Sequence, residues 1–299
     1  MELTVITLAL VLAQAAPRQA APPPQTDETI AVQRGARLNI NNHAGEVIVR
    51  SWEKDAVRVV ARHQPRTRVN VRPTSAGLSI GTSGSMGPAG SVDFEITAPA
   101  WMAMRIEGTF NFVTVEGVQS EVFANTVRGD VIIKGGSGVV TAKSVEGEVR
   151  VEGARGKVSA SSVNERVSLT GVSGDITADT VNGDITMTAI DSRSVDATTV
   201  NGDITFEGKL ADRGHYAFST HNGDIAMGLP DNTNATFTFR NYQGTFSSDF
   251  TLEGYTRGDG QRGRRAVGTL GNGGADVNLE TFGGAIRLRK GSVARPRGR

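Results

Sequence analysis

The chain of 299 residues contains no cysteine, few aromatic residues and almost no net charge. The absence of cysteine excludes disulfide bonds, thiolate metal sites and a cysteine nucleophile. Aromatic residues make up 5% of the chain, so a core would have to consist mainly of small aliphatic side chains. A formal net charge of +1 provides no global field that would recruit nucleic acid or an anionic membrane.

Long apolar runs are also missing, apart from one at the N-terminus. Thr4 to Leu12 has the length of a signal-peptide h-region, and Ala13-Gln14-Ala15 follows as an A-x-A cleavage pattern. The n-region departs from the usual pattern because it contains Glu2 and no Lys or Arg. We predict a signal peptide at residues 1–15 and a Pro/Ala-rich linker at 16–27. No later run is apolar enough for a membrane helix, so we expect an exported protein of the periplasm or cell surface without a transmembrane segment after cleavage.

Glycine, by contrast, is abundant, with 37 residues, and much of it is periodic. Stretches that begin at Gly138, Gly156 and Gly174 align without gaps at a spacing of 18 residues. The most regular glycine belongs to a V-x-G-[DE]-[VI]-x-[VI] unit, whose spacing relaxes to between 19 and 21 residues on either side of the central units. It occurs at Gly108, Gly129, Gly147, Gly183, Gly202, Gly223, Gly244 and Gly284, and Glu165 takes its place once. We expect it to mark a turn with positive φ.

The positions after this glycine alternate between apolar and polar, as Ile185, Thr186 and Met187 illustrate. A period of two predicts a strand with one buried face. Every unit runs in the same direction, which favours parallel, in-register coils over an antiparallel hairpin array. The fold class is therefore predicted to be all-β, a parallel and by default right-handed β-solenoid of about 18–21-residue coils. The column two positions before the glycine is mostly Val, and we expect His221, which occupies it once, to belong to the packing.

Residues 28–105 contain strand-like runs without a strict repeat, and we predict an N-terminal β region that caps the solenoid. The solenoid is assigned to residues 106–290, with Gly284 in its closing cap. Two basic segments follow from the composition: a loop at 252–268 and a tail at 291–299.

The serial V-x-G-D-[IV]-x units and the final F-G-G-x-I-x-L-x-K at Phe282 to Lys290 resemble the bacterial DUF4097 family of adhesin-like β-strand repeat proteins. The resemblance covers roughly residues 28–290. It implies an exported envelope protein of β-solenoid type, and it brings no catalytic residues to carry over.

A column of carboxylates follows the repeated glycine, and it includes Asp184, Asp203 and Asp224. Stacked carboxylates can bind Ca²⁺. However, the chain lacks the nonapeptide of calcium-binding β-rolls, and Arg166 interrupts the column. We expect these side chains to accept hydrogen bonds from nearby backbone N–H groups instead, and we predict no metal or cofactor.

The remaining candidate site is the basic loop. Arg257, Arg262, Arg264 and Arg265 are suited to an anionic envelope glycan, lipid head groups or another envelope protein. No aromatic residues interleave with these arginines as in single-stranded nucleic-acid sites, so nucleic acid is not expected.

The four histidines show no nucleophile or metal spacing, and no catalytic residue is predicted. We expect a non-enzymatic exported envelope protein that serves as an adhesin-like binding or scaffold module. Two alternatives remain open, a β-helix glycan-active enzyme (a lyase or hydrolase) and a purely structural stalk.

Overall fold

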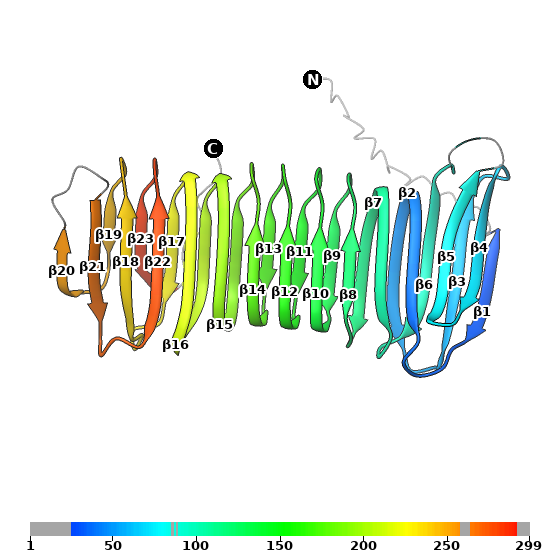
Figure 1. Ribbon diagram of the computed structural model, residues 1–299, viewed down its shortest axis with the longest axis horizontal. Helices are drawn as coiled ribbons and strands as arrows, with labels where there is room; N and C mark the ends of the chain where they lie inside the picture. The colour runs from blue at the N-terminus through cyan, green and yellow to red at the C-terminus, as the bar shows by residue number, and fades with distance from the viewer. Residues whose placement is uncertain (1–24, 85–86, 88, 258–263, 292–299) are drawn as a thin grey trace, which may run out of the picture.

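The computed structural model describes residues 25–84, 87, 89–257 and 264–291. The predicted signal peptide, most of the linker, part of the basic loop and all of the basic tail except Gly291 lie outside this range. In the part that is described, the chain forms 23 strands and no helix, arranged as one elongated body (Figure 1). Accordingly, none of these residues belongs to a helix that could cross a membrane.

The strands in chain order are β1 (Thr26–Ala31), β2 (Arg37–Trp52), β3 (Ala56–His63), β4 (Thr67–Thr74), β5 (Gly77–Gly84), β6 (Val92–Pro99), β7 (Ala103–Val118), β8 (Val122–Asn125), β9 (Val131–Gly135), β10 (Ser137–Lys143), β11 (Val149–Glu152), β12 (Arg155–Ser161), β13 (Val167–Thr170), β14 (Ser173–Asp179), β15 (Ile185–Asn201), β16 (Ile204–Asn222), β17 (Ile225–Leu229), β18 (Ala235–Asn241), β19 (Phe246–Ser248), β20 (Glu253–Arg257), β21 (Arg264–Leu270), β22 (Ala275–Thr281) and β23 (Ile286–Lys290).

The centre of the molecule is a parallel β-solenoid whose coils contribute one strand to each of two faces. On the first face β8, β10, β12 and β14 pair in parallel, and on the second face β9, β11 and β13 do the same. The pairing is in register, so that Val140 lies beside Val158, and Val158 lies beside Ile176. These side chains are buried between the two faces, as period-two alternation requires. The predicted all-β parallel solenoid is therefore confirmed.

The first unit of the repeat is placed differently from its prediction. Val113 pairs with Val131, so Asn111 rather than Gly108 lies beside Gly129. Phe110 and Phe112, expected in the core, are 44% and 56% exposed. The apparent 21-residue spacing at this point arises from an incorrect alignment, because the true offset between the coils is again 18 residues.

The last coil of the chain does not lie at the end of the rod. Strands β22 and β23 pair with β16 and β17 on one side and with β18 and β19 on the other. The coil of β18 and β19 thus comes earlier in the chain but lies further out. The chain then returns, so that β22 and β23 lie between that coil and the coil of β16 and β17 (Figure 1). The expectation that Gly284 belongs to a closing cap is wrong, because its coil is the penultimate one.

The N-terminal region shows the same arrangement. Strand β2 pairs in parallel with β5 and β6 on one side and with β7 on the other, although β5 and β6 follow it in the chain. The predicted boundary between residues 105 and 106 falls inside β7 and is not a structural boundary. Residues 28–105 contribute two coils to the solenoid itself, and the antiparallel strands β1, β3 and β4 cover them.

The stretch 252–268, predicted as a loop, contains two strands. Strand β20 pairs antiparallel with β21, and β21 pairs antiparallel with β18. The apolar residues Ala266 and Leu270 point into the core, and this provides the physical reason for a strand where the arginines suggested a loop.

Candidate functional site

The V-x-G-D turn forms one long corner of the solenoid, and three columns of residues hold the coils together there. The first column is a row of buried hydroxyl side chains that sequence reasoning did not single out. Ser162 Oγ donates to the Gly147 carbonyl at 2.9 Å, and Thr220 Oγ1 donates to the Gly202 carbonyl at 2.9 Å. Each hydroxyl thus satisfies a carbonyl of the neighbouring coil that would otherwise be buried without a partner. The signal was present as the Ser or Thr before V-x-G.

The second column is the repeated glycine, and it needs glycine for a reason other than the one predicted. Of the glycines that were expected to mark this turn, only Gly129 adopts a positive φ. A Cβ on Gly202 would lie 2.0 Å from the Gly183 carbonyl oxygen, and a Cβ on Gly223 would lie 1.9 Å from that of Gly202. The column therefore allows a close approach between backbones. Gly156 and Gly174, which do have a positive φ, are the second residues of β12 and β14.

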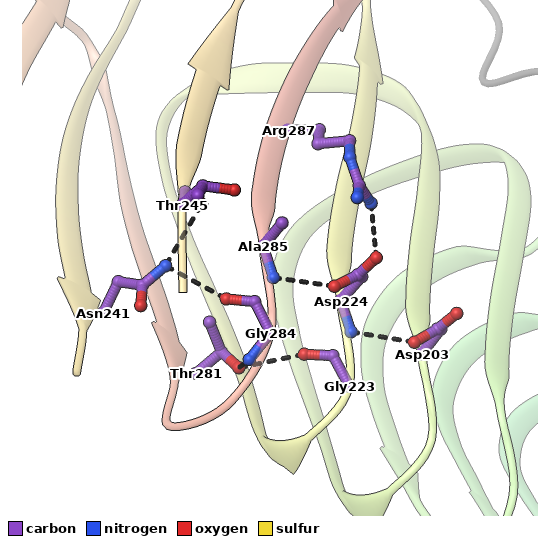
Figure 2. A network of polar contacts seen from close by, with 9 residues as sticks. All are labelled: Asp203, Gly223, Asp224, Asn241, Thr245, Thr281, Gly284, Ala285 and Arg287. Atoms are coloured by element: carbon purple, nitrogen blue, oxygen red, sulfur yellow. Dashed lines mark hydrogen bonds and ion pairs between the residues drawn. The ribbon is translucent and has the colours of Figure 1, made fainter. Parts of the chain in front are cut away.

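The third column is the carboxylate column, and its members bond to the backbone as predicted. Asp184 Oδ1 accepts the Asp203 N–H at 3.0 Å, and Asp203 Oδ1 accepts the Asp224 N–H at 2.8 Å. Asp224 in turn accepts the Ala285 N–H and forms an ion pair with Arg287 (Figure 2). This last contact connects the residue before β17 with β23 and joins the returning coil to its neighbour.

Asp203 differs from its neighbours electrostatically. The neighbouring coils crowd its carboxylate although the residue as a whole is exposed. Desolvation raises the pKa of Asp203, and the nearby charges of Asp224 and Asp184 act in the same direction, against the hydrogen bond from the Asp224 backbone. Within the described ranges no three His, Asp or Glu side chains converge as a metal site would require.

A ladder of amides lies outside these columns. Asn182 donates to Asn164 at 3.0 Å, Asn201 to Asn182 at 2.9 Å, and Asn222 to Asn201 at 2.9 Å. These amides therefore form a continuous ladder over four coils.

The corner also carries an exposed apolar column, which the sequence pattern had suggested to be internal. Between 37% and 45% of each residue is accessible in the five valines Val127, Val145, Val163, Val181 and Val200. The expectation that His221 belongs to the packing is wrong, because it lies exposed in the same column. The valine follows the buried hydroxyl residue, so it lies on the outward side of the same alternation, as Ala142, Ser144 and Val145 show.

The column changes from valine to rings at its C-terminal end. The His221 ring stacks on Phe282, with centroids 4.8 Å apart and planes at 12°. Tyr242 lies on the other side of Phe282, with centroids 5.5 Å apart. Tyr242 and Phe282 are 41% and 37% exposed. These three residues, which we call the ring stack, border an open hollow of ≈ 360 Å³.

The predicted basic site is only partly described. Arg257 ends β20, Arg264 begins β21, and Arg262 lies outside the described residues. Arg265 is exposed and lies opposite Arg240 on β18. Strands β20 and β21, which contain Arg257, Arg264 and Arg265, lie at the outermost edge of the rod, beside the last coil (Figure 1).

The family model described as Toastrack DUF4097 matches residues 177–289. Over this region, which we call the Toastrack region, the chain is similar to the Toastrack DUF4097 family. The Toastrack region begins in β14 and ends in β23, so it includes the returning coil, the ring stack and the described arginines.

Solved structures with a similar arrangement come from three bacteria. A candidate adhesin from Bacteroides fragilis is 12% identical, with a TM-score of 0.42 over 89% of this chain and 98% of the other. A candidate adhesin from Parabacteroides distasonis is 12% identical, with a TM-score of 0.39 over 88% and 96%. A candidate cell adhesion protein from Clostridium sporogenes is 9% identical, with a TM-score of 0.25 over 89% and 100%. No curated protein matches the chain. Likenesses at this level say nothing about the ligand of the Toastrack region.

Proposed function

We propose that this protein is a non-enzymatic, adhesin-like binding or scaffold module of the bacterial cell envelope. The exposed apolar column of the corner carries the proposal. It runs over consecutive coils from Val127 to the ring stack, and contiguous apolar surface that remains exposed marks interaction sites in soluble proteins. The carboxylates and hydroxyls beside it bond to the backbone, and the amides bond to one another, so the apolar column is the repeating feature without a structural role of its own.

The form of the molecule supports the same role. Backbone pairing continues from coil to coil along the whole rod, and this makes an extended and stiff surface of the kind that repeat proteins use for binding. The partner we propose is an anionic envelope glycan, lipid head groups or another envelope protein, with Arg257, Arg262, Arg264 and Arg265 as the cationic contribution.

Export to the periplasm or cell surface is part of the proposal, and the apolar run Thr4 to Leu12 with its A-x-A pattern supports it. Fractionation of host cells that express the chain with a C-terminal epitope tag tests this part. We expect the tagged protein outside the cytoplasm and shortened by about 15 residues. Full-length protein in the cytoplasmic fraction would contradict it.

The binding role is tested with purified protein and envelopes isolated from the host. We expect saturable binding of the labelled chain to envelopes, and no turnover of envelope polysaccharides. Release of reducing ends or unsaturated products that is lost in Asp184→Ala or Asp203→Ala would overturn the non-enzymatic assignment. Absence of any saturable binding would instead indicate a structural stalk.

A further inference from the structure

The ring stack is an unusual use of aromatic residues in this chain. Only 5% of the residues are aromatic, and most of the phenylalanines near the Toastrack core, such as Phe206, Phe218 and Phe237, are fully buried. His221, Phe282 and Tyr242 instead lie at the exposed corner, where five preceding coils use valine. Valine is sufficient for the turn, so the rings serve a purpose that the turn itself does not require.

The topology of the last coil creates this site. In the sequence the three residues occur in the order His221, Tyr242 and Phe282, and the last two are 40 positions apart. Because β22 returns between β16 and β18, Phe282 is inserted between the other two rings. The stack therefore spans three adjacent coils, a distance of about 10 Å along the rod.

The hollow beside the stack has a polar side. Ser219 on β16 and Glu280 on β22 line it, and both lie on the first face next to the corner. Glu280 forms an ion pair with Arg240 at 3.2 Å, so its charge is compensated locally. The hydroxyls of Thr199 and Thr220 also border the hollow, but they already donate to the carbonyls of Gly183 and Gly202.

Rings along one side, with a hydroxyl and a compensated carboxylate along the other, match the surface of a sugar chain. A pyranose ring has apolar C–H groups on its faces and hydroxyls at its rim, and aromatic residues with one apolar and one wet side suit such amphipathic ligands. The volume of ≈ 360 Å³ is within the range of small-ligand sites. The compensated charge disfavours a strongly anionic ligand.

We propose that the ring stack and the adjoining hollow bind a neutral, linear oligosaccharide that lies along the rod. This proposal rests on the proposed binding function, and it names the ligand class and the position of one site. The site is separate from the arginines, which are suited to an anionic partner.

Calorimetric titration of the full chain with cellohexaose and with hexa-N-acetylchitohexaose, both of them neutral, tests the proposal. We expect saturable binding of at least one of them with a Kd below about 1 mM. Phe282→Ala should weaken that binding about tenfold, the factor that corresponds to the loss of one good aromatic contact. Val163→Ala, in the same column but outside the hollow, is the matched control and should bind as the wild type does. Circular dichroism melts establish that each variant is folded, and Tyr242→Ala replaces Phe282→Ala if the latter unfolds.

Two results would overturn the proposal: binding of neither probe at millimolar concentration, or equal binding by the wild type and the folded ring variants. A binding assay with isolated envelopes distinguishes failure of the oligosaccharide proposal from failure of the proposed binding function. We expect periodate treatment of the envelopes, which destroys vicinal diols, to reduce binding, and we expect protease treatment to leave it unchanged. Envelope binding that is lost only after protease treatment and is retained by Phe282→Ala would overturn the glycan site and leave the proposed binding function intact.

Discussion

At the scale of single residues, the repeated glycine shows how closely the coils are packed. In the column from Asn111 to Gly223, two positions are not glycine. They are Asn111, which lies beside Gly129, and Glu165. Elsewhere in this span the backbone carbonyl of one coil occupies the space of the missing Cβ in the next. The sequence periodicity identified the column, but a pattern of one-letter codes does not distinguish a glycine needed for its φ from a glycine needed for space.

We predict that Gly202→Ala destabilises the protein by about 2–4 kcal/mol, because the Cβ would lie 2.0 Å from the Gly183 carbonyl oxygen. The coil would have to move away and weaken its hydrogen bonds. Gly81→Ala is the matched control, since nothing lies within 4 Å of its Cβ and its φ is not left-handed. Thermal and urea unfolding followed by circular dichroism measure both variants, and equal stabilities would contradict the steric explanation.

Asp203 gives a prediction about pH. Its folded pKa is raised above the ordinary value of 3.8, so the folded state binds this proton more tightly than the unfolded state does. Ionisation of Asp203 therefore opposes folding at neutral pH, and this penalty is relieved as the pH falls through the folded pKa towards 3.8. Asp203→Asn should be more stable than the wild type at pH 7, by less than about 1 kcal/mol after screening by solvent, and the difference should disappear near pH 3.5.

Asp224→Asn serves as the contrast for this measurement. The amide can still accept the Ala285 N–H through its oxygen, but the ion pair with Arg287 is lost. We expect this variant to be less stable than the wild type at pH 7, by at most about 1 kcal/mol because both side chains are partly exposed. Opposite signs for the two substitutions would show that the carboxylates of one column differ in their energetic roles. The same sign for both would contradict the argument from their surroundings.

At the scale of strands and coils, the order of the coils in space differs from their order in the sequence at both ends. The repeat predicts which residues of a coil face inwards, as Val158 and Val167 show. It contains no information about which coil lies next to which, because every coil offers the same apolar columns and the same unpaired edges. The link between Asp224 and Arg287 is specific to one pair of coils, and such contacts become visible only in three dimensions.

Engineered disulfides test the coil order, and the absence of natural cysteine leaves no background. Asn278 lies beside Ala217 on one side and beside Thr238 on the other. Neighbouring strands are about 4.8 Å apart, within reach of a disulfide, whereas strands two positions apart are separated by about 9.6 Å. The pairs Ala217→Cys with Asn278→Cys and Thr238→Cys with Asn278→Cys should therefore form the bond on mild oxidation.

The pair Ala217→Cys with Thr238→Cys is the control for these variants. Sequential stacking would place these two residues on adjacent coils, but the observed order places a strand between them. We expect no intramolecular bond in this pair by mass spectrometry of proteolytic fragments. Efficient formation of this bond, together with failure of the other two, would disprove the returning coil.

At the scale of the whole molecule, stability should vary along the rod. Coils of a solenoid contact only their neighbours, so a central coil is supported on two sides and a terminal strand on one. Strands β11 and β13 each pair with two others, whereas β1 and β4 each have one antiparallel partner. Local opening should therefore begin at the ends and leave the centre paired.

Hydrogen exchange followed by mass spectrometry measures this gradient directly. We expect backbone amides of Val149–Glu152 and Val167–Thr170 to exchange most slowly, and those of Thr26–Ala31 and Thr67–Thr74 to exchange soonest. The Toastrack coil formed by β22 and β23 provides the sharper comparison, because it comes last in the chain but is paired on both sides. Its protection should exceed that of β19, which precedes it in the chain and pairs with β23 alone among the described strands. Exchange that instead followed chain order, with β22 and β23 opening before β19, would be incompatible with a coil held inside the rod.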